Sequence, residues 1–413
     1  PFGYVRWTEK RNLDEVIRLI ATGALDLEPL IGETYELSRA QHAFDAIANR
    51  TLKGVAALLE YDVSRPPERE RTVAIRDAVK PRGKLGVSIV GVGNHVLGKH
   101  LPNLKAAADV EVRHLVSASG KNATMVAKEV GATAITSNLD AALEDPDTDL
   151  VMICSSQPEH GEHLVRCIDA GKAVYVEKPM VTTLAQFKAV ATRMAATPVP
   201  FTLGLNRRYS PMLAKLVEFV GAPVAAVEYL VTQPYTPPEH WTLDPIDGGG
   251  RLITEGEHFI DICLMLIDRE PVGVYARALG EEPDDLRRLC NFALTIDCDG
   301  AVGNIIFNES SGAGFPRERI TVMGPGKIAV LDDFAVLSTH GRKPGRRGAK
   351  LSRQMGHKQA LQAFLRQLQG KDSNAIGWAE ASRATMVMFA AQESLRSGER
   401  IDLRDFAAAL WME

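Results

Sequence analysis

A charged pair directly follows an apolar segment in the sequence AVYVEKPM, residues 173–180. Residues 173–176 have the composition of a strand that is covered on both faces in a parallel sheet. Glu177 and Lys178 stand at its end, and Pro179 restricts the backbone behind them. A lysine in such a position can take or give a proton during catalysis. A salt bridge that only closes the strand is the alternative.

A glycine-rich turn follows another apolar segment, in GVSIVGVGNHVLGKHLPNL, residues 86–104. Gly91 and Gly93 permit the tight turn and the close backbone approach that a pyrophosphate needs at a helix N-terminus. Val96 replaces the third glycine of the dinucleotide fingerprint, so a turn without a ligand is the alternative. The position of the turn at the first strand-to-helix crossover favours a dinucleotide site.

The segment after the second predicted strand bears on the choice of dinucleotide. Its sequence, HLVSASGKNA (114–123), has no acidic residue to bind the ribose 2′-hydroxyl of NAD. Ser119 and Lys121 offer a hydroxyl and a cation, which suit the 2′-phosphate of NADP. An ordinary polar loop is the alternative. The segment therefore favours NADP over NAD.

The elements around these residues predict two kinds of sheet. From residue 85, short apolar strands alternate with helical patterns, which is typical of an α/β, Rossmann-type, doubly wound parallel sheet. Beyond about residue 204 the apolar segments are longer, alternate with period two and meet at turns such as the Asp-Gly at 299–300. They predict an α+β domain with a largely antiparallel sheet, closed by helices at 355–369 and 378–397.

A chain of 413 residues is too long for one ordinary core. Changes in composition predict a separate segment over 1–63 and a linker rich in proline and charge over 64–83. A dinucleotide-binding Rossmann domain is expected over 84–203. The remainder, 204–413, is expected to be the substrate and oligomerisation domain.

Composition argues against several classes of protein. A formal net charge of −4 gives no indication of nucleic-acid binding, and no run of about 18 apolar residues is present to cross a membrane. The five cysteines lie far apart without a CxxC pair. This spacing indicates reduced thiols in a cytoplasmic protein rather than disulfides or a zinc site, and no metal site is indicated.

Several motifs together resemble the Gfo/Idh/MocA oxidoreductase family. They are the glycine turn, SSQPEH (155–160), VEKPM, GLNRRYSP (204–211) and GGGRLITEGEHFID (248–261), and the resemblance covers about residues 84–400. Residues 1–63 instead resemble the C-terminal end of a medium-chain, zinc-type alcohol dehydrogenase, as in LIATGALDLEPLIGETYELSRAQHAFDAI. This first segment lacks the zinc-ligand regions of such enzymes, so it is expected to be a structural remnant.

The resemblance to the Gfo/Idh/MocA family implies a set of cofactor contacts. Beside Ser119 and Lys121, it assigns to the dinucleotide Gly91, Gly93, Asn94, His95, Ser155, Gln157, His160, Glu177 and Lys178. It places Lys178 beside the nicotinamide and the substrate hydroxyl as a proton relay. Glu177 is expected to organise Lys178 or the ribose.

His258 is the second predicted catalytic residue. Many family members carry an Asp four residues before this His, which completes a Lys-Asp-His set; here that position is Thr254. Glu255, one helical turn before His258, is a candidate substitute and substrate ligand. Thr254 and Glu257 also fit a capping box that opens a helix. A histidine satisfied within the fold is the alternative for His258.

Further substrate ligands are predicted from the same resemblance and from residue type. Asn206 matches a family substrate contact, while Arg207 and Arg208 could bind sugar hydroxyls or a phosphate. Trp241 could stack on a sugar ring. Surface salt bridges for the arginines, and a packed interface for the tryptophan, are the alternatives.

The predicted function is NAD(P)-dependent hydride transfer between a nicotinamide and a hydroxyl or keto carbon, on a sugar, polyol or nucleotide sugar. One alternative is a sensor or regulator of the same fold that binds the cofactor without turnover. Another is redox-neutral glycoside cleavage in which the cofactor is recycled in place. The resemblance also implies a homo-oligomer, a dimer or tetramer, formed through the open face of the second sheet.

Overall fold

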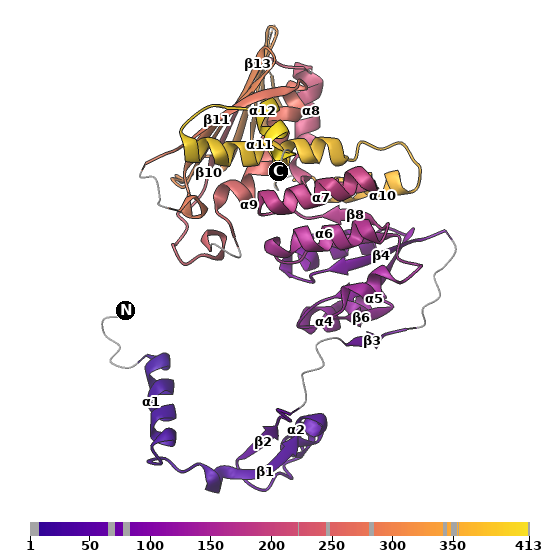
Figure 1. Ribbon diagram of the computed structural model, residues 1–413, viewed down its shortest axis with the longest axis vertical. Coiled ribbons are helices and arrows are strands. Elements are labelled where there is room, and N and C mark those ends of the chain that lie inside the picture. Colours follow the sequence, from indigo (N-terminus) through magenta and orange to yellow (C-terminus); the bar gives the residue numbers. More distant parts are fainter. Residues whose placement is uncertain are drawn as a thin grey trace. The chain divides into compact units, whose positions relative to one another are not determined.

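The computed structural model describes residues 8–64, 71–76, 83–221, 223–244, 248–280, 285–341, 345–347, 353 and 355–411. The chain divides into two compact units, Pro1–Arg69 and Glu70–Glu413, and each is described by itself. Figure 1 traces the elements of both units along the sequence.

Over its described residues, the first unit contains two α-helices and two strands, and the two strands pair in parallel. Its elements are α1 (Glu9–Ala21), β1 (Ile31–Glu36), α2 (Ala40–Ala48) and β2 (Ala56–Glu60). Thr8 caps α1 by accepting a hydrogen bond from Arg11 N. Leu13 and Ile17 lie on one stripe of α1 and are each 63% exposed.

The second unit begins with a Rossmann-type sheet, as the sequence predicts. Among the described residues the strand order is β3-β6-β5-β4-β7-β8-β9. The strands are β3 (Thr72–Ala74), β4 (Leu85–Val90), β5 (Val110–Val116), β6 (Ala134–Thr136), β7 (Leu150–Ile153), β8 (Ala173–Val176) and β9 (Phe201–Leu203). All pairs are parallel except β3 with β6. Strand order reverses between β4 and β7, where ligands of such sheets bind at the carboxyl ends.

Helices connect these strands and follow the predicted alternation. They are a π-helical turn (Val96–His100), α3 (Leu101–Lys105), α4 (Lys121–Val130), α5 (Leu139–Leu143), α6 (His160–Asp169) and α7 (Leu184–Ala196). Residues 72–74, inside the segment predicted as a linker, form the antiparallel edge strand β3. Proline and charge in that segment are compatible with an edge strand, because an edge strand forms a ladder on one side only.

The second sheet is largely antiparallel, which confirms the predicted fold class. Its order over the described residues is β17-β16-β15-β14-β10-β13-β12-β11-β18. The strands are β10 (Ala226–Thr232), β11 (Pro271–Ala278), β12 (Phe292–Cys298), β13 (Ala301–Asn308), β14 (Glu318–Gly324), β15 (Lys327–Asp332), β16 (Val336–His340), β17 (Gly345–Arg347) and β18 (Ile401–Asp402). Only β10 and β13 pair in parallel among them.

Helices cover one face of this sheet (Figure 1). They are α8 (Pro211–Val220), α9 (Arg251–Ile267), α11 (Trp378–Ser397) and α12 (Leu403–Leu410), while α10 (His357–Leu368) packs on the Rossmann core. A Cβ at Gly303 of β13 would lie 3.0 Å from Cys263 Cβ of α9, so these elements pack closely. Ile306, on the opposite face of β13, is 44% exposed.

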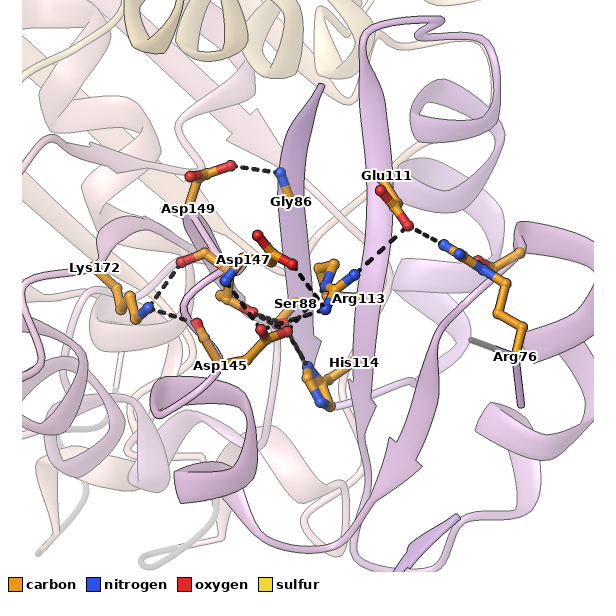
Figure 2. Close-up of polar contacts among 12 residues, drawn as sticks. Arg76, Gly86, Ser88, Glu111, Arg113, His114, Asp145, Asp147, Asp149 and Lys172 are labelled. Carbon is orange, nitrogen blue, oxygen red and sulfur yellow. Dashed lines mark hydrogen bonds and ion pairs between the residues drawn. The ribbon is translucent and has the colours of Figure 1, made fainter. Parts of the chain in front are cut away.

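A buried polar network fastens the amino ends of the Rossmann strands (Figure 2). The Arg113 guanidinium on β5 donates to Asp145, with 2.9 Å from Nε to Oδ2. Asp149 accepts from Gly86 N at 2.7 Å, which ties β7 to β4. Lys172 Nζ donates to the carbonyl oxygen of Asp145 at 2.9 Å. The network links the strands at the end of the sheet that lies opposite the glycine turn.

No helix in the described part of the chain is both long and apolar enough to cross a membrane.

Candidate active site

The glycine turn at the carboxyl end of β4 has the backbone that a dinucleotide requires. Gly91 has φ +85°, and a Cβ there would lie 2.5 Å from Cys154 O, so a larger residue does not fit. Gly93 has no atom within 4 Å of an added Cβ, which leaves its outer side open. Val96 is fully buried in the core, which explains a side chain at the third glycine position. These residues fit a pyrophosphate at the turn.

Glu177, at the end of β8, joins this turn through two histidines. Glu177 Oε1 lies 2.7 Å from His100 Nε2 and 3.3 Å from His95 Nε2. Burial alone would raise the pKa of Glu177, but the two imidazoles hold it well below its usual range. The predicted cofactor turn and the EKP segment therefore meet at one ionised carboxylate.

Lys178 lies where β8 and the first turns of α9 come together. Its Nζ donates to Thr254 O at 2.7 Å and lies 3.9 Å from Glu255 Oε1. The side chain keeps 23% of its surface exposed, so it is accessible to a small molecule. The peptide bond between Lys178 and Pro179 is cis. Burial would raise the pKa of Glu255, but the charges of Lys178 and Arg207 lower it.

His258 lies on α9, three residues after Glu255 and on the same helical face. Its side chain is buried, and Nδ1 has no hydrogen-bond partner among the described residues. Burial, together with the nearby Arg207 and Lys178 cations, holds the pKa of His258 well below 6.5. A neutral imidazole at this position can accept or donate one hydrogen bond without adding charge.

The capping box predicted at Thr254 and Glu257 is wrong, because α9 already begins at Arg251. Thr254 Oγ1 donates to Gly250 O inside the helix. Glu257 is fully buried and accepts hydrogen bonds from Met180 N at 3.1 Å and from Thr385 Oγ1 at 2.7 Å. Burial raises the pKa of Glu257 to about 7. No sequence motif indicated this role, because Met180 and Thr385 lie far from Glu257 along the chain.

The SSQPEH segment is fastened to the turn after Lys178. His160 Nδ1 lies 2.7 Å from Pro179 O, and Nε2 lies 3.2 Å from Ser155 O. Both ring nitrogens face carbonyl oxygens, so the structure gives His160 a role in holding the turn. Ser155 Oγ lies 2.9 Å from His163 Nδ1, and Gln157 Oε1 is buried without a hydrogen-bond partner among the described residues.

Ser119 and Lys121 lie at the N-terminus of α4, and both are exposed. The next residue, Asn122, donates from Nδ2 to Val92 O at 2.9 Å. This bond holds the segment beside the glycine turn, where a 2′-substituent of the cofactor ribose would bind.

The two arginines predicted as substrate ligands form internal ion pairs. Arg207 donates to both carboxylate oxygens of Glu318, from Nε at 2.8 Å and from Nη2 at 3.0 Å. Arg208 binds Asp261 of α9 at 2.6 and 3.0 Å. These pairs give both arginines a structural role, and direct contact with a substrate stays a prediction.

The other two predicted substrate ligands differ in exposure. Asn206 is buried, and its Nδ2 donates to Met355 O at 2.6 Å. Trp241 is 51% exposed in a short 3₁₀ turn, so its ring is available for stacking.

Comparisons with known proteins agree with this geometry. The model of the Gfo/Idh/MocA oxidoreductase family, with an NAD-binding Rossmann fold, matches residues 85–205. The chain is 31% identical over 137 residues to 4-carboxy-2-hydroxymuconate-6-semialdehyde dehydrogenase of Sphingobium sp. (strain NBRC 103272 / SYK-6). That alignment spans 33% of this chain and 44% of that enzyme, less than half of its length.

Two longer matches extend into the second sheet. Myo-inositol 2-dehydrogenase of Thermotoga maritima is 23% identical over 335 residues, covering 77% of this chain and 98% of that enzyme. A levoglucosan dehydrogenase solved in complex with NADH and levoglucosan has the same fold, with a TM-score of 0.66 and 19% identity. The structural alignment covers 78% of this chain and 99% of the levoglucosan dehydrogenase chain. Residues 85–205 of this chain therefore match the family of Gfo/Idh/MocA oxidoreductases, which has an NAD-binding Rossmann fold.

Proposed function

We propose that this oxidoreductase transfers hydride between NAD(P) and a hydroxyl or keto carbon of a sugar, polyol or sugar derivative. The position of Lys178 carries the proposal. Its Nζ lies beside the carboxyl end of β8, hydrogen-bonded to Thr254 O and close to the Glu255 carboxylate. The neighbouring Glu177 is joined to the glycine turn through His100 and His95.

Each residue has a distinct task in this reaction. The glycine turn would hold the pyrophosphate, and a bound nicotinamide would supply the hydride acceptor or donor. Lys178 Nζ takes the hydroxyl proton during oxidation and returns it during reduction. Glu255 keeps the Lys178 side chain in place and accepts a hydrogen bond from a second hydroxyl. His258, as a neutral imidazole, orients the substrate.

The substrate class rests on the polarity of this site and on the relatives. Lys178, Glu255 and His258 offer donors and acceptors of the kind that several hydroxyl groups need. Named relatives include dehydrogenases of myo-inositol and scyllo-inositol. A sugar or polyol is therefore the proposed substrate, with a nucleotide sugar as a larger variant of the same class.

Cofactor preference, assembly and location complete the proposal. The absence of an acidic residue over 117–123 supports NADP as the preferred dinucleotide. The partly apolar open face around Ile306 supports a homo-oligomer. All five cysteines are free thiols, which supports a reducing compartment such as the cytoplasm.

Turnover with a panel of polyols, sugars and nucleotide sugars tests this function. Net formation of NADH or NADPH absorbance is expected with at least one of them. Dinucleotide binding without any turnover would favour the sensor, and product formation without net reduced cofactor would favour redox-neutral glycoside cleavage.

A further inference from the structure

Two histidines and one glutamate converge between the glycine turn and the end of β8. The ligand atoms of His95, His100 and Glu177 all lie within 4.8 Å of one another. Both histidines present Nε2 to the same carboxylate oxygen, at 3.3 and 2.7 Å. Two imidazoles and a carboxylate are a donor set that Zn²⁺ and similar ions use in proteins.

A local departure from α-helical geometry brings the two histidines together. Residues five apart on an α-helix point about 140° away from each other, at 100° per residue. Here Val96–His100 is a π-helical turn, and Leu101 N donates to Val96 O five residues back. The wider turn places His95 and His100 on one side, with ring centroids 5.2 Å apart. Such π-turns occur frequently at functional sites.

The distances from Glu177 Oε1 to the two imidazole nitrogens are near the ligand separation of a tetrahedral ion. Two ligand atoms that are each about 2.0 Å from a tetrahedral zinc ion lie about 3.3 Å apart. The separation of His95 Nε2 and Glu177 Oε1 already has this value, at 3.3 Å. The 2.7 Å separation of His100 Nε2 and Glu177 Oε1 has to lengthen by about 0.6 Å to reach the tetrahedral value.

We propose that His95, His100 and Glu177 bind one divalent transition-metal ion of the Zn²⁺ type. His100 and Glu177 are largely buried, with side chains 1% and 13% exposed, so they form the fixed part of the site. His95 is 47% exposed and forms the side from which an ion enters. Three protein ligands leave a fourth position for water or another small ligand.

The site goes beyond the dehydrogenase function, because hydride transfer to a nicotinamide needs no metal. The sequence motifs assign His95 and Glu177 to the dinucleotide and give no indication that they meet His100. Glu177 lies 77 residues after His100, and only the pairing of β4, β7 and β8 brings them together. The competing explanation is a carboxylate that only accepts hydrogen bonds from two imidazoles.

Calorimetric titration of the untagged, dinucleotide-free chain with Zn²⁺ distinguishes the two explanations. One ion per chain is expected, and Co²⁺ should give the visible absorption of a four-coordinate site. His95→Ala, which removes an exposed ligand, should weaken binding by at least about 100-fold, beyond the usual effect of losing a residue that only supports a ligand. His340→Ala removes an exposed histidine of β16 and should bind as the native chain does.

A second variant and a folding control keep the result interpretable. His95→Gln retains a hydrogen-bond donor to Glu177, so it separates metal ligation from hydrogen bonding. It should also lose the ion, with an unchanged circular dichroism spectrum. No stoichiometric binding to the native chain, or equal affinity in native protein and both His95 variants, would overturn the proposal.

Discussion

At the scale of single residues, two buried carboxylates beside the candidate site have pKa values shifted in opposite directions. Glu177 is kept ionised by two imidazoles, whereas Glu257 has hydroxyl and amide donors and its pKa is raised to about 7. Glu257 links the turn after Lys178 to α9 and α11 through Met180 and Thr385. We therefore expect Glu257 to be a positioning residue that acts on Lys178, the proposed proton relay, through the backbone of Met180.

Glu257 predicts a specific dependence of stability on pH. Its pKa is higher in the folded state than the ordinary 4.5, so the folded state binds more protons between about pH 4.5 and about pH 7. Its contribution to the free energy of unfolding is present below that range and is lost as pH rises through it, by up to about 3 kcal/mol. Urea denaturation should show that Glu257→Gln flattens this part of the profile. Parallel profiles for native and variant protein would contradict the assigned pKa.

At the scale of elements, the alternation of short strands and helices was enough to predict the Rossmann sheet. The helix predicted at 378–397 is present with those bounds, because its ends coincide with Gly377 and Gly398. The start of α9 was predicted too late, because Thr254 and Glu257 have the residue types and spacing of a capping box. In the structure Thr254 Oγ1 donates to Gly250 O, and Glu257 accepts from the distant Thr385. The ion pairs of Arg207 and Arg208 could not be predicted either, because their partners lie on other elements.

The strand-to-helix turn offers a matched pair of glycine variants. Gly91→Ala should lower the free energy of unfolding by about 1–3 kcal/mol, because φ is +85° and the new Cβ would lie 2.5 Å from Cys154 O. Gly93→Ala should leave stability unchanged, because its Cβ has open space, and should weaken dinucleotide binding alone. Denaturant unfolding and dinucleotide titration separate the two effects. Equal stability losses would show that the open side of the turn was assigned wrongly.

The first turn of α4 carries the prediction on cofactor choice. Lys121→Ala should weaken NADP binding by about tenfold and leave NAD binding nearly unchanged, as expected for one charged contact to a 2′-phosphate. Lys128→Ala, an exposed lysine in the last turn of the same helix, is the control. Titration of both dinucleotides measures the ratio. A clear preference of the native protein for NAD would contradict the assignment.

At the scale of the whole molecule, the second sheet has one face that no helix of the described residues covers. Ile306 is 44% exposed there and pairs across strands with Leu230 and Ala293, which gives the face an apolar centre. If this face forms the homo-oligomer, Ile306→Glu should lower the mass measured by light scattering. Met125→Glu, at a 71% exposed position on α4, should not. Unchanged mass in the Ile306 variant would place the contact elsewhere.

The central claim concerns Lys178, and kinetics of the Lys178→Ala variant test it most directly. Because the glycine turn is proposed to hold the dinucleotide, cofactor affinity should stay within a few-fold of the native value. Turnover should fall by roughly 10²–10⁴, as expected for the loss of a positioned general acid and base. His258→Ala should act more on KM than on kcat, since a neutral imidazole mainly orients the substrate. Unchanged turnover in Lys178→Ala, or loss of cofactor binding together with activity, would contradict the assigned proton relay.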